Sequence, residues 1–323
     1  MASSDRKLVR LDYCDIGARF VKDTHYFTRL LRTRYDVDIS CQPDLIIHSH
    51  DGYQHRLYPC PRVLYTAETD QPDYRETDFS ISQLDWGDPR NLRLPVYSLW
   101  TDPEPLAKQP GEAEAALAAK SRFCCFFTSY VGEKIKRRLG FFEQLSRYKQ
   151  VDSAGGAMNN IGQRIPFELS AKLNFLRPYK FYMAFENESR VGYTTEKIVE
   201  AMLARCVPIY WGNPAIVEEF NPKSFINVHD FPNDEAVIEH IRQVDQDDDL
   251  YREYLRQPFF HDNKPNIYFS KERLLNFFEQ AIAAPHGRRH RGALLGRWTL
   301  AKVNKRHDPH ADYKINWRPG RTV

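Results

Sequence analysis

Strand-like and helix-like runs alternate along this chain in two series, and this alternation constrains the fold more than any other feature. In the first series, residues 21–35 carry apolar side chains at helical spacing, at Phe27, Leu30 and Leu31. Short apolar runs typical of strands lie at residues 7–13, 37–41, 45–48, 63–66 and 94–97. Strands separated by helices pair in parallel as βαβ units, so this part of the chain is predicted to form a Rossmann-like domain.

A second series follows residues 102–119, a stretch rich in Pro, Ala and Glu that is typical of a linker leading into a helix. Its strand-like runs lie at residues 123–129, 181–186, 207–211 and 226–228, and its helix-like runs at 134–145, 195–205, 234–244 and 271–283. We predict an α/β chain of two Rossmann-like domains facing a cleft, residues 1–118 and 119–285, and a tail at 286–323. Several classes of enzyme and binding protein share this architecture, so the fold alone leaves function open.

The length and composition agree with a two-domain globular protein. The chain has 323 residues, of which 42% are hydrophobic and 28% charged. No run approaches the roughly 18 apolar residues that cross a bilayer. The first residues have no apolar core of the kind found in secretory signals. We therefore expect a cytoplasmic protein.

The tail is strongly basic. From residue 284 to the end there are ten Lys and Arg against two Asp. Apolar residues such as Leu294, Trp298 and Val303 lie between the charges, so the tail could form an amphipathic helix on an anionic membrane surface, here the inner membrane. A solvated terminus is the alternative. No nucleic-acid-binding motif accompanies the charge, so we predict no nucleic acid partner.

The chemistry concentrates in residues 180–231. An apolar strand ends at Phe185, a polar loop containing Gly192 follows, and a helix begins near Thr195, a residue type that favours helix starts. In open α/β sheets, ligands bind outside the carboxyl ends of the strands. The loop at 186–194 is therefore predicted to line a binding site.

Lys197 is the most informative residue of this segment. It falls in the first turn of the predicted helix, where the helix dipole disfavours a cation. Backbone N–H groups point the same way, so a lysine there suits a diphosphate. A solvated lysine that bends away from the helix is the alternative. Glu196 beside it is either an ordinary helix-start residue or an acceptor for ribose hydroxyls.

Three runs in this segment resemble a known family. FENESRVGYTTEK (185–197), VPIYWGNP (207–214) and FNPKSFINVHDF (220–231) are similar to the signature of α1,3-fucosyltransferases of glycosyltransferase family 10, above all the bacterial members that build Lewis-type antigens. The resemblance extends more weakly through VDSAGGAMNNIG (151–162) and RVLYTAETDQPDY (62–74).

The resemblance implies a fold and a reaction. The family has the GT-B fold, inverts the anomeric configuration, takes fucose from GDP-β-L-fucose and needs no metal or other cofactor. The acceptor would be a glycan containing GlcNAc, such as N-acetyllactosamine, giving a Lewis x product. Another GDP-sugar, another acceptor, an α1,4 linkage, a non-catalytic sugar-nucleotide binder and a metal hydrolase stay open as alternatives.

The resemblance also implies site residues. Lys197 and Arg138 would hold the pyrophosphate, with Arg137 as an adjacent alternative to Arg138. Glu196 would contact the ribose. The remaining donor-loop positions would be Asn187 and Tyr193.

The general base implied by the resemblance is Glu68. The family places this glutamate in a TGEN-like segment. In this chain the segment is TAET, with Ala67 in place of the family's glycine and Thr69 in place of its asparagine. Glu68 follows the apolar run VLYTA, so it is expected at the carboxyl end of a strand, where a partly buried carboxylate removes a hydroxyl proton. An ordinary surface glutamate is the alternative.

A cluster of His48, His50 and Asp51, with His55 nearby, follows a strand of the first domain. This loop is where an acceptor is expected to bind, and His48, His50 and Asp51 are our candidate acceptor contacts. His and Asp at short spacing also suit zinc, and a purely structural loop is a third possibility. We predict no metal in the catalytic site.

Overall fold

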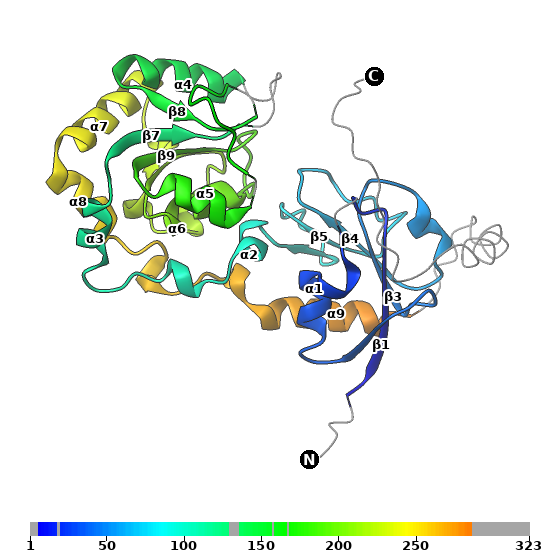
Figure 1. The fold of residues 1–323 in the computed structure, drawn as a ribbon. Helices are drawn as coiled ribbons and strands as arrows, with labels where there is room; N and C mark the ends of the chain where they lie inside the picture. The colour runs from blue at the N-terminus through cyan, green and yellow to red at the C-terminus, as the bar shows by residue number, and fades with distance from the viewer. Residues whose placement is uncertain (1–5, 18–19, 129–135, 157, 167, 286–323) are drawn as a thin grey trace. The chain divides into compact units, whose positions relative to one another are not determined.

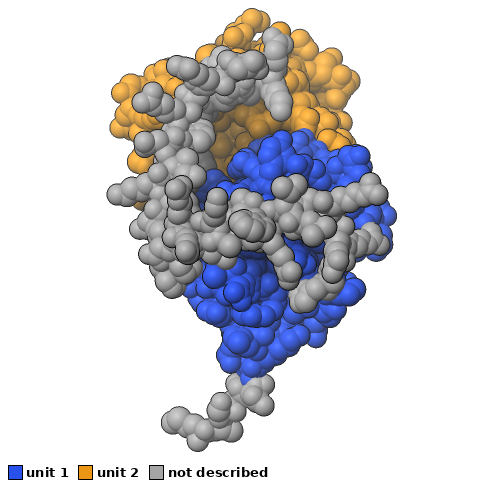
Figure 2. Space-filling view, turned by 90° about the vertical axis from the view of Figure 1, so that its right-hand side faces the viewer, with its two compact units in different colours: residues 1–94, 270–323 blue, residues 95–269 orange. Residues whose placement is uncertain are grey.

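The computed structural model describes residues 6–17, 20–128, 136–156, 158–166 and 168–285. The chain divides into two compact units, residues 1–94 with 270–323 and residues 95–269 (Figure 2). Among the described residues, no helix has the length and apolar character needed to span a membrane. The basic tail predicted at 286–323 lies outside the described residues.

The first unit is built on a six-stranded parallel sheet with the order β2-β1-β3-β4-β5-β6. The order reverses between β1 and β3, as in doubly wound sheets. The strands are β1 (Leu8–Cys14), β2 (Asp36–Ile39), β3 (Leu45–His48), β4 (Arg62–Thr66), β5 (Phe79–Ser82) and β6 (Asn91–Arg93).

The prediction of a strand at residues 94–97 is wrong. The last strand ends at Arg93, and residue 97 already begins α2 (Tyr97–Trp100). Pro95 explains the difference, because proline has no N–H to donate to a sheet ladder. The helix expected at 21–35 is shorter, consisting of η1 (Lys22–Thr24) and α1 (Tyr26–Leu31).

Helix α9 (Lys271–Ala283) returns to the first unit and packs beside α1 (Figure 1). The ring of Phe278 in α9 lies edge-on to Phe27 of α1, 5.4 Å between centroids, and both are fully buried. Arg34 binds Glu272 at 2.6 Å. The apolar face of α9 is thus buried in the first core, which corrects the assignment of residues 270–285 to the second domain.

The second unit contains a five-stranded parallel sheet with the order β11-β10-β9-β7-β8. Its order reverses between β7 and β9, so this sheet also has a topological switch point. The strands are β7 (Arg122–Phe126), β8 (Val151–Ser153), β9 (Tyr179–Phe185), β10 (Val207–Trp211) and β11 (Ile226–Asn227).

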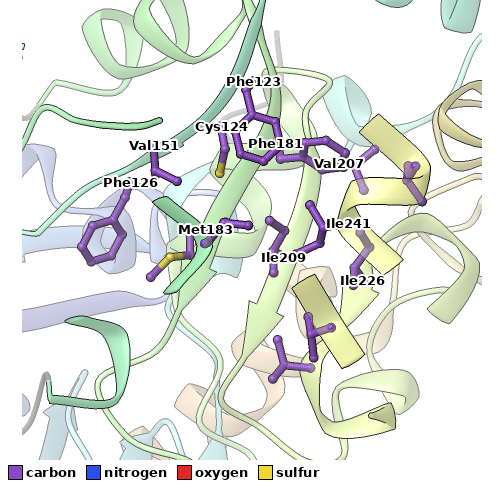
Figure 3. Close-up of a cluster of buried hydrophobic side chains, with 14 of the residues drawn as sticks. Phe123, Cys124, Phe126, Val151, Phe181, Met183, Val207, Ile209, Ile226 and Ile241 are labelled. Carbon is purple, nitrogen blue, oxygen red and sulfur yellow. The ribbon is translucent and has the colours of Figure 1, made fainter. Parts of the chain in front are cut away.

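Alternate residues of β9 are buried on opposite faces of this sheet. Phe181 and Met183 point into a core completed by α4 (Lys136–Tyr148) and α7 (Asp234–Gln246), where Ile241 is fully buried (Figure 3). Because both faces are covered, the strand is apolar at nearly every position instead of alternating with polar residues.

The opposite face is covered by α5 (Leu169–Leu176) and α6 (Glu196–Leu203). Tyr182 and Ala184 of β9 pack there against Ile198 of α6. This face fixes α6 against β9, and so fixes the loop that joins them.

Residues 95–118 also belong to the second unit, which corrects the boundary predicted at 118/119. The small side chains of Ala113 and Ala116 in α3 (Glu112–Ala118) are buried in its core. Helix α3 lies along α8 (Asp248–Arg256), and Arg256 of α8 binds Glu114 of α3 at 2.8 Å. The stretch that the composition identifies as a linker is therefore part of a folded core.

We predict that Phe278→Ala destabilises the first unit selectively. Removing a fully buried ring from a core costs about 3–5 kcal/mol, whereas Gln280→Ala on the exposed side of the same helix costs little. Hydrogen exchange read by mass spectrometry reports each unit separately. Faster exchange in β1 and β3 with unchanged exchange in β9 is expected, and the reverse pattern would contradict the placement of α9.

Candidate functional site

The switch point of the second sheet collects charged side chains from several elements. Glu186 directly follows β9, and the loop after it leads into α6, which carries Glu196 and Lys197. Arg138 comes from α4, the helix that follows β7. The carboxyl ends of β7 and β9 lie side by side, and ligands of doubly wound sheets bind at this position.

Glu186 is the centre of this arrangement. It is fully buried, and Oε1 accepts a hydrogen bond from the Thr195 backbone N at 2.7 Å. Oε2 accepts hydrogen bonds from Thr195 Oγ1 at 2.7 Å and from Lys197 Nζ at 3.0 Å. A buried carboxylate is costly unless donors surround it, and these three donors all come from the start of α6.

Thr195 occupies the N-cap position predicted for it, but its hydroxyl does not cap the helix. The hydroxyl donates to Glu186 and accepts a hydrogen bond from Lys197 Nζ at 2.7 Å. The first turn of α6 is therefore tied to the end of β9 through side chains.

Lys197 is held in place and is not a solvated lysine, because only 16% of its side chain is exposed. Burial alone would lower the pKa of Lys197, but the carboxylates of Glu186 and Glu196 outweigh burial and the repulsion from Arg138. Its pKa is consequently raised above the ordinary value. The ammonium therefore stays charged at neutral pH, at a helix start that already favours anions.

Arg138 is buried beside the same loop. Its Nε donates to the backbone oxygen of Glu186 at 2.8 Å, and its Nη2 donates to Oδ1 of Asn187. Burial lowers the pKa of Arg138, opposed chiefly by Glu186, but a guanidinium stays protonated in proteins.

Arg137 has a different environment, although it is adjacent in sequence. It binds Asp234 at 2.5 and 2.7 Å and lies over the ring of Trp211 at 5.5 Å. The structure thus brings Arg138, and not Arg137, to the backbone of the loop after β9.

Glu196 and the loop complete the site. The Glu196 side chain is 21% exposed. Burial is the largest influence and raises its pKa, but Lys197, Lys172 and hydrogen bonds together outweigh burial, so the pKa lies below its ordinary value and the carboxylate can accept hydrogen bonds. Gly192 has a φ of 87°, which favours glycine, and its N–H donates to Asn213. The Tyr193 ring is buried, so it belongs to the wall of the loop.

Sequence reasoning missed Glu186 and Gly212. A Cβ on Gly212 would lie 2.4 Å from Glu186 Cγ, so the absence of a side chain at this position lets β10 approach the buried carboxylate. One signal was visible, because Glu186 is the first charged residue after the apolar strand. The residues that bury and bind Glu186 come from three separate elements. They cannot be identified from the order of residues in the sequence.

Glu68 lies in the first unit, two residues after β4, and its side chain is exposed. Its backbone N–H donates to Thr66 Oγ1 at 3.2 Å. Its expected place just beyond the carboxyl end of a parallel strand is confirmed, whereas the partial burial expected of its carboxylate is wrong, because the side chain is exposed.

His48 ends β3 and is 3% exposed, unlike His50 and Asp51, which are exposed. Its Nε2 lies 3.2 Å from Thr77 Oγ1, and its Nδ1 lies 3.1 Å from a backbone oxygen. Burial lowers the pKa of His48 to about 3, so the ring is neutral. Both ring nitrogens are thus engaged within the protein, and the acceptor contact expected of His48 stays a prediction.

Ligand atoms of Asp15, His48 and His55 all lie within 4.8 Å of one another. The two rings are stacked, with centroids 4.1 Å apart and planes 13° from parallel. Imidazole binds metals through lone pairs in the ring plane, so stacked rings do not aim at one ion. Asp15 instead anchors the loop after β3, accepting hydrogen bonds from the N–H groups of Gln54 and His55 and lying 2.7 Å from His55 Nδ1.

Comparison with known proteins identifies the class. The chain has two doubly wound parallel sheets, and it shares this GT-B glycosyltransferase fold with solved alpha1,3-fucosyltransferases. A model of the family described as glycosyltransferase family 10 (fucosyltransferase), C-terminal part, matches residues 117–270. A model of the alpha-(1,3)-fucosyltransferase FucT N-terminal domain matches residues 11–100. The chain belongs to glycosyltransferase family 10, the fucosyltransferases.

Individual relatives agree with this assignment. Alpha-(1,3)-fucosyltransferase FucT of Helicobacter pylori is 28% identical over 305 residues, covering 81% of this chain and 62% of that protein. Mouse alpha-(1,3)-fucosyltransferase 4 is 34% identical over 166 residues, covering 50% of this chain and 37% of that protein. The chain thus spans less than two thirds of the length of these relatives.

Solved structures match over more of their length. An alpha1,3-fucosyltransferase crystallised with GDP-fucose has a TM-score of 0.73 and 26% identity, with 89% of this chain and 94% of that chain covered. An alpha1,3-fucosyltransferase crystallised with GDP has a TM-score of 0.72 and 26% identity, with 88% of this chain and 93% of that chain covered.

We predict opposite effects for two glycine substitutions in this unit. Gly212→Ala forces a Cβ against Glu186 and should lower stability, because the neighbour is a buried, fully bonded carboxylate. Gly140→Ala in α4 meets nothing within 4 Å and should raise stability by about 0.5–1 kcal/mol. The denaturant midpoints of the two variants measure both effects. A Gly212→Ala variant as stable as the wild type would contradict the packing described.

Proposed function

We propose that this protein is an inverting α1,3-fucosyltransferase, which moves L-fucose from GDP-β-L-fucose to a GlcNAc-containing glycan such as N-acetyllactosamine. The observation that carries the proposal is the pair of cations, Arg138 and Lys197, held around Glu186 at the switch point of the second sheet. Family membership supports the donor, and the solved relative with GDP-fucose supports the nucleotide.

Stabilisation of the leaving group is the task proposed for the two cations. Negative charge grows on the GDP diphosphate as the bond to fucose breaks, and fixed cations lower the energy of that state. Arg138 has a planar fork that suits two phosphate oxygens, and Lys197 acts as a point charge. The raised pKa of Lys197 keeps this charge in place at neutral pH. We propose that no metal or other cofactor is required.

Glu68 is the proposed general base. Its carboxylate would take the proton from the acceptor hydroxyl as that oxygen attacks the anomeric carbon of fucose. Attack from the face opposite GDP inverts the configuration, from the β-linked donor to an α-fucoside. The exposed position of Glu68 after β4 supports access by an acceptor. Glu196 would accept hydrogen bonds from the ribose, and the loop of Asn187 and Tyr193 would wall the donor.

Glu68→Gln is expected to lower kcat about 10²–10⁴-fold while leaving GDP affinity unchanged, because general-base help is lost and the donor site is intact. Mass spectrometry of product from GDP-fucose and N-acetyllactosamine measures this. Asp70→Asn, an exposed acid two residues away, is the matched control and should retain activity. Equal losses in the two variants would contradict the assignment of Glu68.

Lys197→Ala should weaken GDP binding by about 10- to 100-fold, as expected for losing a charged hydrogen bond. Isothermal titration with GDP measures this, and exposed Lys223→Ala in the same unit is the control. A Lys197→Ala variant that binds GDP normally would contradict the role of Lys197.

Wild-type transfer should survive EDTA, because no metal is proposed to take part. Activity abolished by EDTA would contradict the metal-free mechanism. Transfer from GDP-mannose in preference to GDP-fucose would point to another GDP-sugar.

A further inference from the structure

We propose that Glu186 is a positioning residue for the donor diphosphate, acting through Lys197, the start of α6 and Arg138. This inference rests on the proposed function, since it concerns the same cations. Glu186 itself is fully buried, so it is not expected to touch the substrate.

Glu186 joins four elements at one point. Its side chain binds α6 through Thr195 and Lys197, and its backbone oxygen accepts a hydrogen bond from Arg138 of α4. Its backbone N–H donates to the oxygen of Trp211 at the end of β10, at 2.8 Å. Both proposed phosphate ligands, Lys197 and Arg138, are therefore held in position by one residue at the end of β9.

The direction of the Lys197 ammonium follows from these contacts. An ammonium has three N–H donors. One binds Glu186 at 3.0 Å and one binds Thr195 Oγ1 at 2.7 Å, while the nearest Glu196 oxygen is 3.6 Å away. Two fixed donors leave the third with a set direction, so the cation is oriented before a ligand arrives. Such preorganisation strengthens binding because little side-chain entropy remains to be lost.

A carboxylate is required at this position, because every group that hydrogen-bonds to the side chain of Glu186 is a donor. The backbone N–H of Thr195, its hydroxyl and the Lys197 ammonium all point hydrogens at the two oxygens. Glutamine has almost the same shape, but its NH₂ group would face these donors. Glu186→Gln therefore removes charge and one acceptor without opening a cavity.

The charge of Glu186 also matters for Lys197. Apart from burial, the groups with the largest effect on the pKa of this ammonium are Glu186, Glu196, Arg138 and Tyr193, and Glu200 interacts with it more weakly. Without Glu186, the carboxylate of Glu196 must oppose both burial and Arg138, so the pKa of Lys197 falls. A lysine with a lowered pKa is charged at low pH and neutral at high pH. Donor capture by the variant should then decline as pH rises, in a range where the wild type holds steady.

The test compares GDP affinity and the pH dependence of kcat/KM for GDP-fucose in the wild type and Glu186→Gln, because kcat/KM reports groups of the free enzyme. We expect about a 10- to 100-fold loss of GDP affinity and a new decline on the alkaline side. Glu186→Asp keeps the charge and should restore the alkaline plateau, even with weaker binding. Thr195→Val removes only the bridging hydroxyl and should weaken GDP binding in the same direction.

The matched control is Asp245→Asn. Asp245 is another buried acid of this unit and binds Tyr148 and Lys149, away from the loop after β9. This variant should lose stability but keep GDP affinity and the wild-type pH profile. Wild-type affinity and profile in both Glu186→Gln and Thr195→Val would overturn the inference while leaving the proposed function intact. A wild-type protein that does not bind GDP would overturn the proposed function, and the inference with it.

Discussion

The buried carboxylate of Glu186 is the interaction on which the second unit depends. A charge in the protein interior must be surrounded by donors, and here the donors come from the residues that start α6. Satisfying this one group closes the loop after β9, fixes the first turn of the helix and holds Lys197. Gly212 lets the neighbouring strand approach, and Arg138 binds the backbone oxygen of the same residue. The conformation of this loop and the placement of Lys197 and Arg138 therefore have a common origin.

Both units use the same topology, but their switch points are occupied differently. In the second, cations gather beside a buried acid. In the first, the strands that flank the reversal end at Cys14 and His48, and Asp15 binds the loop that contains His55. The rings of His48 and His55 are stacked, buried and hydrogen-bonded, and the His48 ring is neutral. Residues of a binding-site type at a binding-site position can thus serve to hold a loop.

Local pattern was sufficient for several features of the site and of the fold. The apolar run of β9, the polar loop with Gly192, and the helix that begins at Glu196 follow from short-range rules of periodicity and helix starts. The place of Lys197 in the first turn of this helix was likewise predictable. The choice between Arg137 and Arg138 was not, because neighbouring helical residues point in different directions and only their partners, Asp234 and Glu186, distinguish them.

By itself, the sequence determined the two α/β series, the segment that carries the chemistry and the resemblance to fucosyltransferases, since each is written in consecutive residues. Tertiary structure alone decided that α9 belongs to the first unit, that residues 95–118 belong to the second, that the His48 ring is internal, and that Glu186 organises the site. These features depend on contacts between residues far apart in the chain, such as Phe27 with Phe278. Periodicity shows which face of an element is apolar, but it does not show which core that face completes.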